Sequence, residues 1–579
     1  MAGTTPNMGG AMSFSPALLG QSPSHLLNFK HRSSAFNSPD MAALGGVPQI
    51  SMPGDESKKK ELGDILKLLA MRPGRISEEG VERLVKRMGL ESYKDYANGV
   101  VTMSLAAKIF LLDIDFKDNK ILRVALSFSN TPGPSEELAP LAASILHANL
   151  SPPGVRAPLI NPSLADFADN LERLTKADRL SYPPNLNCFT AITGLYQSLE
   201  KIYNHEKESL EGGSVGAMCK GNGRPRMHIR KKVGLSIDYW REKRIPRGNE
   251  DEEDDNEEIW RVLVEVEEIP TDFTNMNPIT PVRTSDHWVS DEVKKPIEDN
   301  LFGESEDMVT DWLEPPLEGI LDMNDTNPRP PPARFIARLD PPVVVPFQDE
   351  IQLFAGLMLS PPPALSLGTL SLGTLQAKLF LDAPSASGVQ RKLYVPNNDL
   401  EEEEGIHHEY KLHSLKPIFA RQILEVPFSH PKELVGVFSI LRQFAHVSAL
   451  LKSCFSPVAG IIPKTEDPAA APSEDKEMDL DAFLADGNDM TDGTAQPVPV
   501  DINVTEGQNG AFALGVIFPQ KTGRGVVGCN FEVGRNADIR ATELSADDGK
   551  LGLDANGLEW ALAIGSDLGI VVEWLRRKS

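Results

Sequence analysis

The chain has 579 residues, which exceeds one ordinary hydrophobic core and predicts two or three folded units. Its 58 Lys and Arg residues against 83 Asp and Glu residues give a formal net charge of −25, a balance that disfavours nonspecific binding to nucleic acid or to an anionic membrane. The four cysteines lie far apart without a CxxC pair, which argues against a disulfide scaffold and indicates a reducing compartment. No apolar run approaches the ~20 residues that a membrane-spanning helix needs.

Residues 1–57 are rich in Gly, Ser, Pro, Met and Asn, and this composition predicts a disordered tail. Residues 58–210 are predicted to form a helical N-terminal domain with one β-hairpin. Its first helix ends before Pro73-Gly74 and has one apolar stripe, formed by Leu62, Ile65, Leu66 and Leu69. The second helix begins after Ser77, a predicted N-cap, and ends at Gly89.

Two runs in which apolar and polar residues alternate, 112–116 and 122–128, indicate the hairpin, with its turn at 117–120. One face of this hairpin should contact water. Two further helices follow, and each has an apolar stripe that needs a partner surface. The stripes consist of Leu164, Phe167, Leu171 and Leu174 in the first helix and of Phe189, Ile192, Tyr196, Leu199 and Tyr203 in the second.

Residues 211–462 change to short alternating segments separated by Pro and Gly, which predicts a β-rich middle domain. Within it, 378–382 is predicted to pair with 391–395 as strands. The domain is predicted to end in a helix over 440–454.

Residues 463–503 are acidic and rich in Pro and Ala, a composition typical of a disordered insertion. Residues 504–579 are predicted to form a hairpin with its turn at 522–525, followed by helical sequence over 556–577. The predicted fold class is therefore α+β, helical at both ends with a β-rich middle.

The histidine-rich segment HHEYKLH, residues 407–413, resembles a metalloprotease signature. A zinc-binding helix needs histidines at i and i+4, whereas His408 and His413 are five residues apart. We therefore interpret His407, His408 and His413 as surface residues of a strand or loop and predict no metal site. A metal-dependent hydrolase around His407–His413 stays an alternative function.

The basic stretch 224–247 contains nine Lys or Arg residues with Tyr239 and Trp240 among them, a composition that suits nucleic acid. An alternation of apolar and polar residues favours instead a half-buried strand with solvated basic ends; the apolar residues are Val233, Leu235, Ile237 and Tyr239. The acidic run 250–258 would weaken attraction to phosphate. Direct DNA binding through 224–247 is thus a second alternative, and the prediction is that the chain does not bind nucleic acid directly.

Two sets of apolar residues are candidates for binding a protein partner. In the acidic insertion, apolar and acidic residues are interleaved, as in segments that fold on a partner's groove; the candidates are Met478, Leu480, Phe483 and Leu484. The C-terminal helical sequence has an apolar side with the candidates Leu568, Val572 and Leu575. No phosphate-binding loop or nucleophile elbow occurs in the sequence, so we predict neither an enzyme nor a cofactor.

Seven sequence strings occur in a fixed order: GVERLVKRMGLE from Gly80, FLLDIDF from Phe110, SLADFADNLERLTKADRLS from Ser163, LNCFTAITGLYQSLEKIY from Leu186, VGLSIDYW from Val233, ILRQFAHVSALLKSC from Ile440 and SDLGIVVEWL from Ser566. Through these strings the chain resembles the fungal form of subunit 1 of Mediator, the coactivator complex of RNA polymerase II. The resemblance implies a nuclear, non-catalytic subunit of the Mediator middle module. Its expected role is to relay signals from DNA-bound activators to RNA polymerase II and the general transcription factors.

The sequence departs from the family at one point. Animal relatives recruit nuclear receptors through Leu-x-x-Leu-Leu helices, and this sequence has no strict match. The nearest segments are Ile65–Leu69 and Val447–Leu451, whose leucines we interpret as core residues. Receptor recruitment by this mechanism is therefore not expected.

Overall fold

The structure is a computed structural model, and it describes residues 62, 72–118, 120–129, 134–151, 163–182, 186–242, 259–269, 282–296, 308–315, 333–359, 372–380, 387–395, 404–455, 461–462, 497–507, 510–521, 525–546 and 555–578. The chain divides into two compact units after Met71, and every described residue except Leu62 belongs to the second. The predicted tail 1–57, most of the first predicted helix and most of the predicted insertion lie outside the described residues. The proposed division into domains at 58–210, 211–462 and 504–579 stays a prediction.

The described fold begins with helix α3 (Glu78–Arg87) and a four-stranded antiparallel sheet. The Ser77 side chain accepts a hydrogen bond from the Gly80 N–H at 3.0 Å, so the predicted N-cap is confirmed. The sheet has the order β1-β2-β3-β4, with β1 (Glu91–Ala97), β2 (Val100–Ala106), β3 (Phe110–Lys117) and β4 (Lys120–Phe128). The predicted hairpin is β3–β4. Strands β1 and β2 were not predicted, because β1 is an edge strand and its sequence ESYKDYA lacks apolar alternation.

Four helices follow: α4 (Pro134–Leu150), α5 (Ala165–Leu180), α6 (Cys188–Ser209) and α7 (Gly213–Cys219). The predicted stripe of α5 is buried throughout. In α6 the buried face is rotated from the predicted one, because Ile192, Tyr196 and Tyr203 are only half-buried; the fully buried positions include Cys188, Ala191, Leu195, Leu199 and Ile202. Helix α4 was not predicted, and it contains an internal proline, Pro140.

The middle of the chain forms a six-stranded sheet with the order β11-β14-β10-β7-β6-β5. Its strands are β5 (Arg224–Ile229), β6 (Lys232–Arg241), β7 (Ile259–Glu268), β10 (Ala333–Pro346), β11 (Gly373–Thr374) and β14 (Phe419–Phe428). A separate ribbon pairs β8 (Val289–Pro296) with β9 (Met308–Trp312), and α8 (Phe347–Gly356) follows β10. The predicted pairing of 378–382 with 391–395 is wrong. Lys378 lies in the short helix α9 (Leu375–Leu379), and the 391–395 strand pairs elsewhere.

The C-terminal part is a seven-stranded sheet with the order β15-β12-β13-β16-β17-β18-β19, in which only β13 and β16 pair in parallel. Its strands are β12 (Ser387–Val395), β13 (Glu404–Ser414), β15 (Ile461–Ile462), β16 (Val498–Glu506), β17 (Phe512–Pro519), β18 (Val526–Val533) and β19 (Ile539–Ala546). The predicted C-terminal hairpin is β17–β18. After the 3₁₀ turn η3 (Arg535–Ala537), the predicted helical sequence forms two helices, α12 (Ala555–Ile564) and α13 (Leu568–Lys578).

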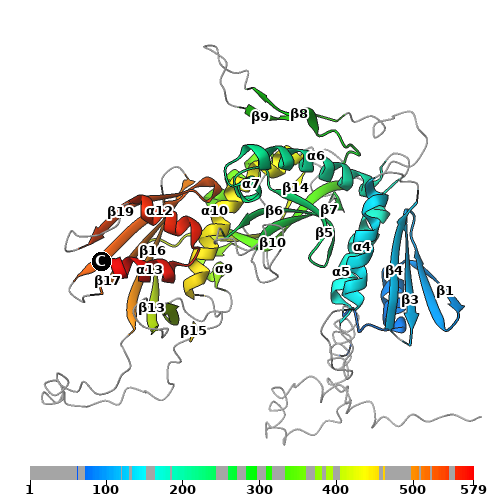
Figure 1. The fold of residues 1–579 in the computed structure, drawn as a ribbon, viewed down its shortest axis with the longest axis horizontal. Coiled ribbons are helices and arrows are strands. Elements are labelled where there is room, and N and C mark those ends of the chain that lie inside the picture. Colours follow the sequence, from blue (N-terminus) through cyan, green and yellow to red (C-terminus); the bar gives the residue numbers. More distant parts are fainter. Residues whose placement is uncertain are drawn as a thin grey trace, which may run out of the picture. The chain divides into compact units, whose positions relative to one another are not determined.

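Helix α10 (Pro431–Phe455) contains the predicted helix and contacts both larger sheets (Figure 1). It touches β6, β10 and β14 of the six-stranded sheet and β12 and β18 of the seven-stranded sheet. By length and composition α10 is apolar enough to cross a membrane, contrary to the expectation from sequence. However, 83% of its apolar window is buried inside the protein, as in the core helix of a soluble protein. The predicted α+β class is confirmed.

Candidate functional site

Helix α10 joins the two larger sheets through a buried arginine. Arg442 has only 2% of its surface exposed. It donates hydrogen bonds to the carbonyl oxygens of Tyr239 at 2.9 Å and Met218 at 3.0 Å, to the carbonyl of Gly221, and to Asn536 Oδ1 at 2.9 Å. Burial lowers the pKa of Arg442 to about 10, yet the guanidinium keeps its charge at pH 7. One side chain therefore connects α10 with α7, β6 and η3.

The next residue of α10 extends this junction. Gln443 donates to the carbonyl oxygens of Gly510 and Val533, both at 2.8 Å, and its side-chain oxygen accepts from Arg535 Nη1 at 2.7 Å. Arg535 in turn forms an ion pair with Asp349 of α8 at 2.8 Å. These contacts hold the end of β18 against α8 and α10.

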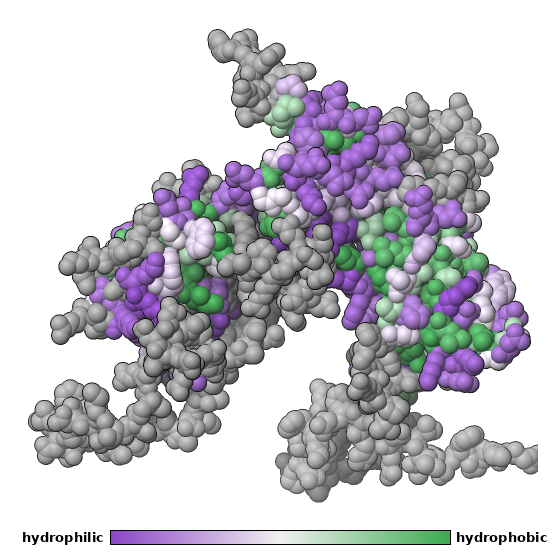
Figure 2. Space-filling model, viewed as in Figure 1, coloured by the Kyte–Doolittle hydropathy of each residue, from purple (hydrophilic) through white to green (hydrophobic). Residues whose placement is uncertain are grey.

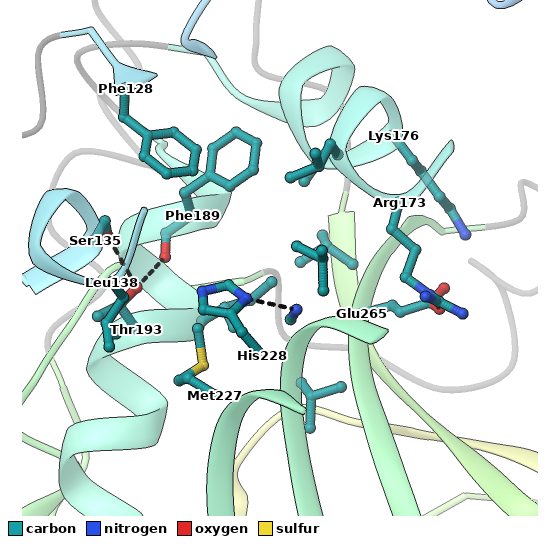
Figure 3. Close-up of a pocket in the computed structure, with 17 residues that line it drawn as sticks. Phe128, Ser135, Leu138, Arg173, Lys176, Phe189, Thr193, Met227, His228 and Glu265 are labelled. Atoms are coloured by element: carbon teal, nitrogen blue, oxygen red, sulfur yellow. Dashed lines mark hydrogen bonds and ion pairs between the residues drawn. The ribbon is translucent and has the colours of Figure 1, made fainter. Parts of the chain in front are cut away.

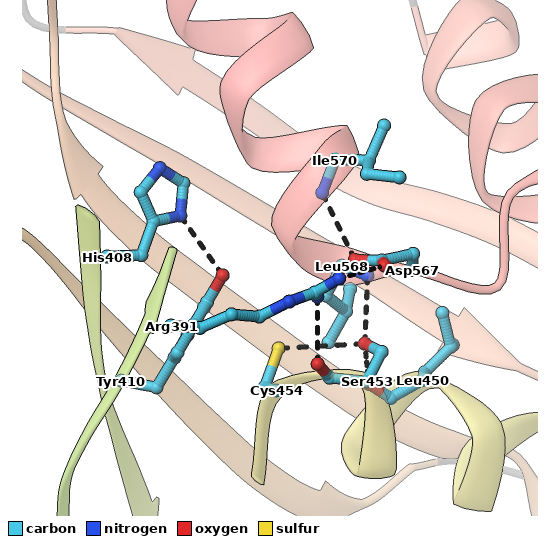
Figure 4. A network of polar contacts seen from close by, with 9 residues as sticks. All are labelled: Arg391, His408, Tyr410, Leu450, Ser453, Cys454, Asp567, Leu568 and Ile570. Atoms are coloured by element: carbon cyan, nitrogen blue, oxygen red, sulfur yellow. Dashed lines mark hydrogen bonds and ion pairs between the residues drawn. The ribbon is translucent and has the colours of Figure 1, made fainter. Parts of the chain in front are cut away.

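A polar network attaches the C-terminal helices to β12 and to the end of α10 (Figure 4). Arg391 forms two hydrogen bonds with the Asp567 carboxylate, at 2.8 and 2.7 Å, and donates to the Ser453 carbonyl at 2.8 Å. The Leu568 N–H donates to Ser453 Oγ at 3.2 Å. A Cβ atom on Gly569 would overlap the Tyr410 hydroxyl, so only glycine lets α13 begin this close to β13.

The structure places Leu568, Val572 and Leu575, the predicted partner-binding residues of the C-terminal helices, on the inner face of α13. Each has at most 1% of its surface exposed. They pack within the chain itself, so a role in binding a partner would be indirect. The exposed apolar side chains of these helices are instead Trp560, at 64%, and Ile570, at 56%.

The histidines of HHEYKLH lie on β13 and do not converge. His407 and His413 project from one side of the strand and His408 from the other, because neighbouring residues of a strand alternate. His408 was expected at the surface, which is wrong. It is fully buried, with Nδ1 3.0 Å from Tyr410 Oη and Nε2 3.4 Å from Glu573 Oε2 of α13. Within the described part of the chain, no group of three His, Cys, Asp or Glu residues could hold a metal ion.

Of the basic stretch 224–247, the structure describes residues 224–242, and part of them is buried. The predicted half-buried strand is β6, whose residues 235–240 are buried on both faces. Its Asp238 has no exposed surface and lies 3.5 Å from Arg224 and 3.4 Å from Arg261, and Arg226 donates to the same carboxylate at 2.5 Å. The expectation that the basic ends are solvated is thus wrong for Arg224 and Arg226. Residues 243–258, with the acidic run, lie outside the described residues.

Two asparagines fix the β5–β6 turn against the helices. Asn170 of α5 has no exposed surface, donates to the Lys231 carbonyl at 2.7 Å and accepts from the Val233 N–H at 2.8 Å. It also donates to Asn149 of α4 at 2.7 Å. Arg230 and Lys231 adopt positive φ angles of 46° and 63° in this turn. Uncharged amides therefore fix this turn to α4 and α5, while an ion pair between Arg173 and Glu265, at 2.8 Å, joins α5 to β7.

Beside this turn lies an apolar cavity with a volume of ≈ 60 Å³ (Figure 3). Helices α4, α5 and α6 supply one side of its lining and strands β5, β6 and β7 the other. The apolar residues of the lining are Phe128, Leu138, Leu174, Ala177, Phe189, Ile192, Met227, Val233, Val264 and Val266. His228 is among its few polar residues, and no pattern in the sequence had singled it out.

Exposed apolar side chains also occur on the N-terminal sheet and on α4. Figure 2 shows apolar residues gathered over this region, where Leu111, Leu122 and Leu141 are 39%, 51% and 45% exposed. Strand β1 adds Tyr93 at 59% and Tyr96 at 69%. The candidate residues Met478, Leu480, Phe483 and Leu484 lie outside the described residues.

Comparison with known proteins agrees with the resemblance found in the sequence. The subunit 1 of Mediator of RNA polymerase II transcription from Schizosaccharomyces pombe is 32% identical over 170 residues, which cover 29% of this chain and 35% of that protein. The protein of the same name from Eremothecium gossypii is 31% identical over 126 residues, which cover 21% of this chain and 28% of that protein. The aligned part thus spans about a third of the length of these relatives.

The family model described as Mediator of RNA polymerase II transcription subunit 1 matches residues 63–456. This range includes every described element from α3 to α10. Because it covers more than half of the sequence, the chain belongs to the family of subunit 1 of Mediator of RNA polymerase II transcription.

Proposed function

We propose that this protein is a non-catalytic subunit of the Mediator middle module in the nucleus. It acts as a scaffold and adaptor that relays signals from DNA-bound activators to RNA polymerase II and the general transcription factors. The observation that carries the proposal is the family match over residues 63–456. No cofactor and no membrane take part in this function, and contact with DNA is indirect.

The proposed mechanism is binding through preformed faces. The buried contacts of Arg442 and Gln443 hold α10 to both larger sheets, so surfaces on either side keep a fixed geometry. We assign the contacts with neighbouring subunits to the exposed apolar side chains of the C-terminal helices, Trp560 and Ile570. The acidic segment with Met478, Leu480, Phe483 and Leu484 is proposed as a site for transient partners such as activators.

The test is purification of the endogenously tagged protein from nuclear extract at moderate salt, with identification of the co-eluting proteins. Subunits of the Mediator middle module should elute with it in comparable amounts. A monomeric peak without them would overturn the proposal.

Matched variants distinguish a binding face from a folding defect. The double variant Trp560→Ser and Ile570→Ser should lose co-eluting subunits while keeping the unfolding temperature, because both side chains are exposed. Ile517→Ser is the control, since Ile517 is 41% exposed on a different element, β17. Leu568→Asp should instead lower the unfolding temperature, because Leu568 is buried. If the double variant retains every subunit, the C-terminal helices are not the binding face.

A further inference from the structure

The cavity beside the β5–β6 turn has the composition of a ligand site rather than of a packing defect filled by water. Its volume of ≈ 60 Å³ exceeds severalfold the ~10–15 Å³ that one water needs. Most of the side chains that line it are aliphatic or aromatic, a composition that favours an apolar occupant. An empty cavity of this size also loses dispersion contacts that an apolar occupant would restore.

Six polar side chains line the cavity, and four of them, Ser135, Thr193, Arg173 and Glu265, are paired with each other. Ser135 and Thr193 are joined through their hydroxyl oxygens at 2.8 Å, and the Thr193 hydroxyl donates to the Phe189 carbonyl at 2.9 Å. Arg173 donates to Glu265 at 2.8 Å at the other side of the lining (Figure 3). These groups therefore need no ligand to complete their hydrogen bonds.

His228 differs from them. Its Nδ1 accepts a hydrogen bond from the Gly234 N–H at 3.1 Å, so the ring proton must be on Nε2. Burial lowers the pKa of His228 to about 4, which keeps the imidazole neutral at pH 7. Among the described residues, no hydrogen bond joins Nε2 to another side chain or to the backbone, and the atom is not among the fully buried ones, so it can donate to a molecule in the cavity. His228 has a positive φ angle of 54°, a backbone conformation that is uncommon outside glycine, and its ring lies in the lining.

We propose that this cavity binds a small, mostly apolar molecule of about four to six non-hydrogen atoms that carries one hydrogen-bond acceptor for Nε2–H of His228. The acceptor is uncharged, such as a ketone or an ether oxygen, because an ion would lose its hydration in this apolar lining. Since α4–α6 and β5–β7 line the cavity from two sides, the bound molecule adds contacts between the N-terminal helices and the six-stranded sheet.

The first experiment is a methyl NMR titration of the full-length protein labelled at Ile and Met methyl groups, with cyclopentanone and cyclopentane as matched probes. The Ile192 and Met227 resonances should shift saturably with both probes, and cyclopentanone should bind at least fivefold more tightly. Ile502, which is buried in β16, serves as the control resonance and should not move. Absence of saturable shifts at Ile192 and Met227, or equal shifts at Ile502, would overturn the proposal.

Two variants distinguish the contribution of the apolar lining to binding from that of the His228 donor. Ile192→Trp should fill the cavity and weaken both probes at least tenfold. His228→Phe should abolish the preference for cyclopentanone and keep the binding of cyclopentane. Retention of the preference in this variant would exclude His228 as the donor.

Because the positive φ angle at position 228 strains a bulky side chain, a measurement on the unaltered protein replaces this variant if it fails to fold. The imidazole ¹⁵N resonance of Nε2 should shift on addition of cyclopentanone and stay in place with cyclopentane. An equal response to both probes would contradict the proposed hydrogen bond.

Discussion

The two junctions of the six-stranded sheet are built differently. On the C-terminal side, Arg442 and Arg535 supply charged donors to α7, α8, β6 and η3; Arg442 is buried and Arg535 is 28% exposed. On the N-terminal side, α4 and α5 contact the sheet through the amides of Asn149 and Asn170 and through one ion pair, Arg173–Glu265 at 2.8 Å, beside an apolar cavity. Charged donors give stronger and more directional hydrogen bonds than neutral ones. The C-terminal junction should therefore be the more rigid, and the N-terminal junction the one that a ligand or partner adjusts.

The largest expected effect is the loss of stability on removal of Arg442, the buried charged donor of the C-terminal junction. We expect Arg442→Met to lower the free energy of unfolding by about 3–4 kcal/mol, because it leaves several buried acceptors without donors. Urea unfolding measures the loss, and hydrogen exchange should show it first in η3 and α7. Arg540→Met removes the same charge from an exposed position and should change stability by less than ~0.5 kcal/mol. Equal losses in the two variants would mean that burial does not decide the strength of the junction.

The equivalent change at the other junction is Asn170→Ala. Its amide makes hydrogen bonds with Asn149, Arg173, Lys231 and Val233, all between 2.7 and 2.8 Å. We expect a loss of about 2–3 kcal/mol, smaller than for Arg442 because the removed amide is uncharged, whereas Arg442 donates from a charged group. Exchange of the β5–β6 amides with solvent should accelerate while η3 stays protected. Acceleration in both places would show that the junctions are one cooperative unit.

The parts of this fold that were predictable from sequence are those set by neighbouring residues. The β3–β4 and β17–β18 hairpins follow from alternation around a short turn, and Ser77 acts as N-cap within its own turn. Strand β1 and helix α4 were missed because the first lies at a polar edge and the second has a proline in its interior. The order of apolar and polar residues therefore indicates neither β1 nor α4.

The candidate site was less predictable, because its partners are far apart in the sequence. From sequence, His408 was expected at the surface. In the structure α13 covers it, and its ring lies near Glu573. From sequence, Arg224 and Arg226 suited a nucleic-acid-binding surface. In the structure both pair with the buried carboxylate of Asp238 on β6. No pattern in the sequence singled out Arg442, which is buried because α10 is covered on nearly all sides. Charge alone thus predicted surface positions where the fold has interior ones.

The pH dependence of stability tests the role of His228 at the N-terminal junction. Burial lowers the pKa of His228 to about 4, below its ordinary value of 6.5, so the unfolded chain takes up a proton between these values more readily than the folded one. Stability should therefore fall as the pH decreases from 6.5 to 4.5, by on the order of 2 kcal/mol from this group. The variant His228→Asn, whose side chain tolerates a positive φ angle, should lack this part of the loss. Identical pH profiles of unfolding would contradict the assignment.

A small effect is expected from a paired charge that is neither buried nor part of a junction. Lys94 of β1 forms ion pairs with Glu78 at 2.8 Å and Glu82 at 2.7 Å, and these side chains are between 21% and 26% exposed. The hydrogen bonds from Lys86 and Lys94 lower the pKa of Glu82 to about 2, so any contribution is lost only as the pH falls below about 4.5. We expect Lys94→Met to cost less than ~1 kcal/mol at pH 7, and less still at high salt. Lys94→Met removes one positive charge with two hydrogen bonds and Arg442→Met one positive charge with four, so the ratio of their effects per hydrogen bond measures what burial adds. A ratio near one would remove the physical basis for treating the C-terminal junction as the rigid one.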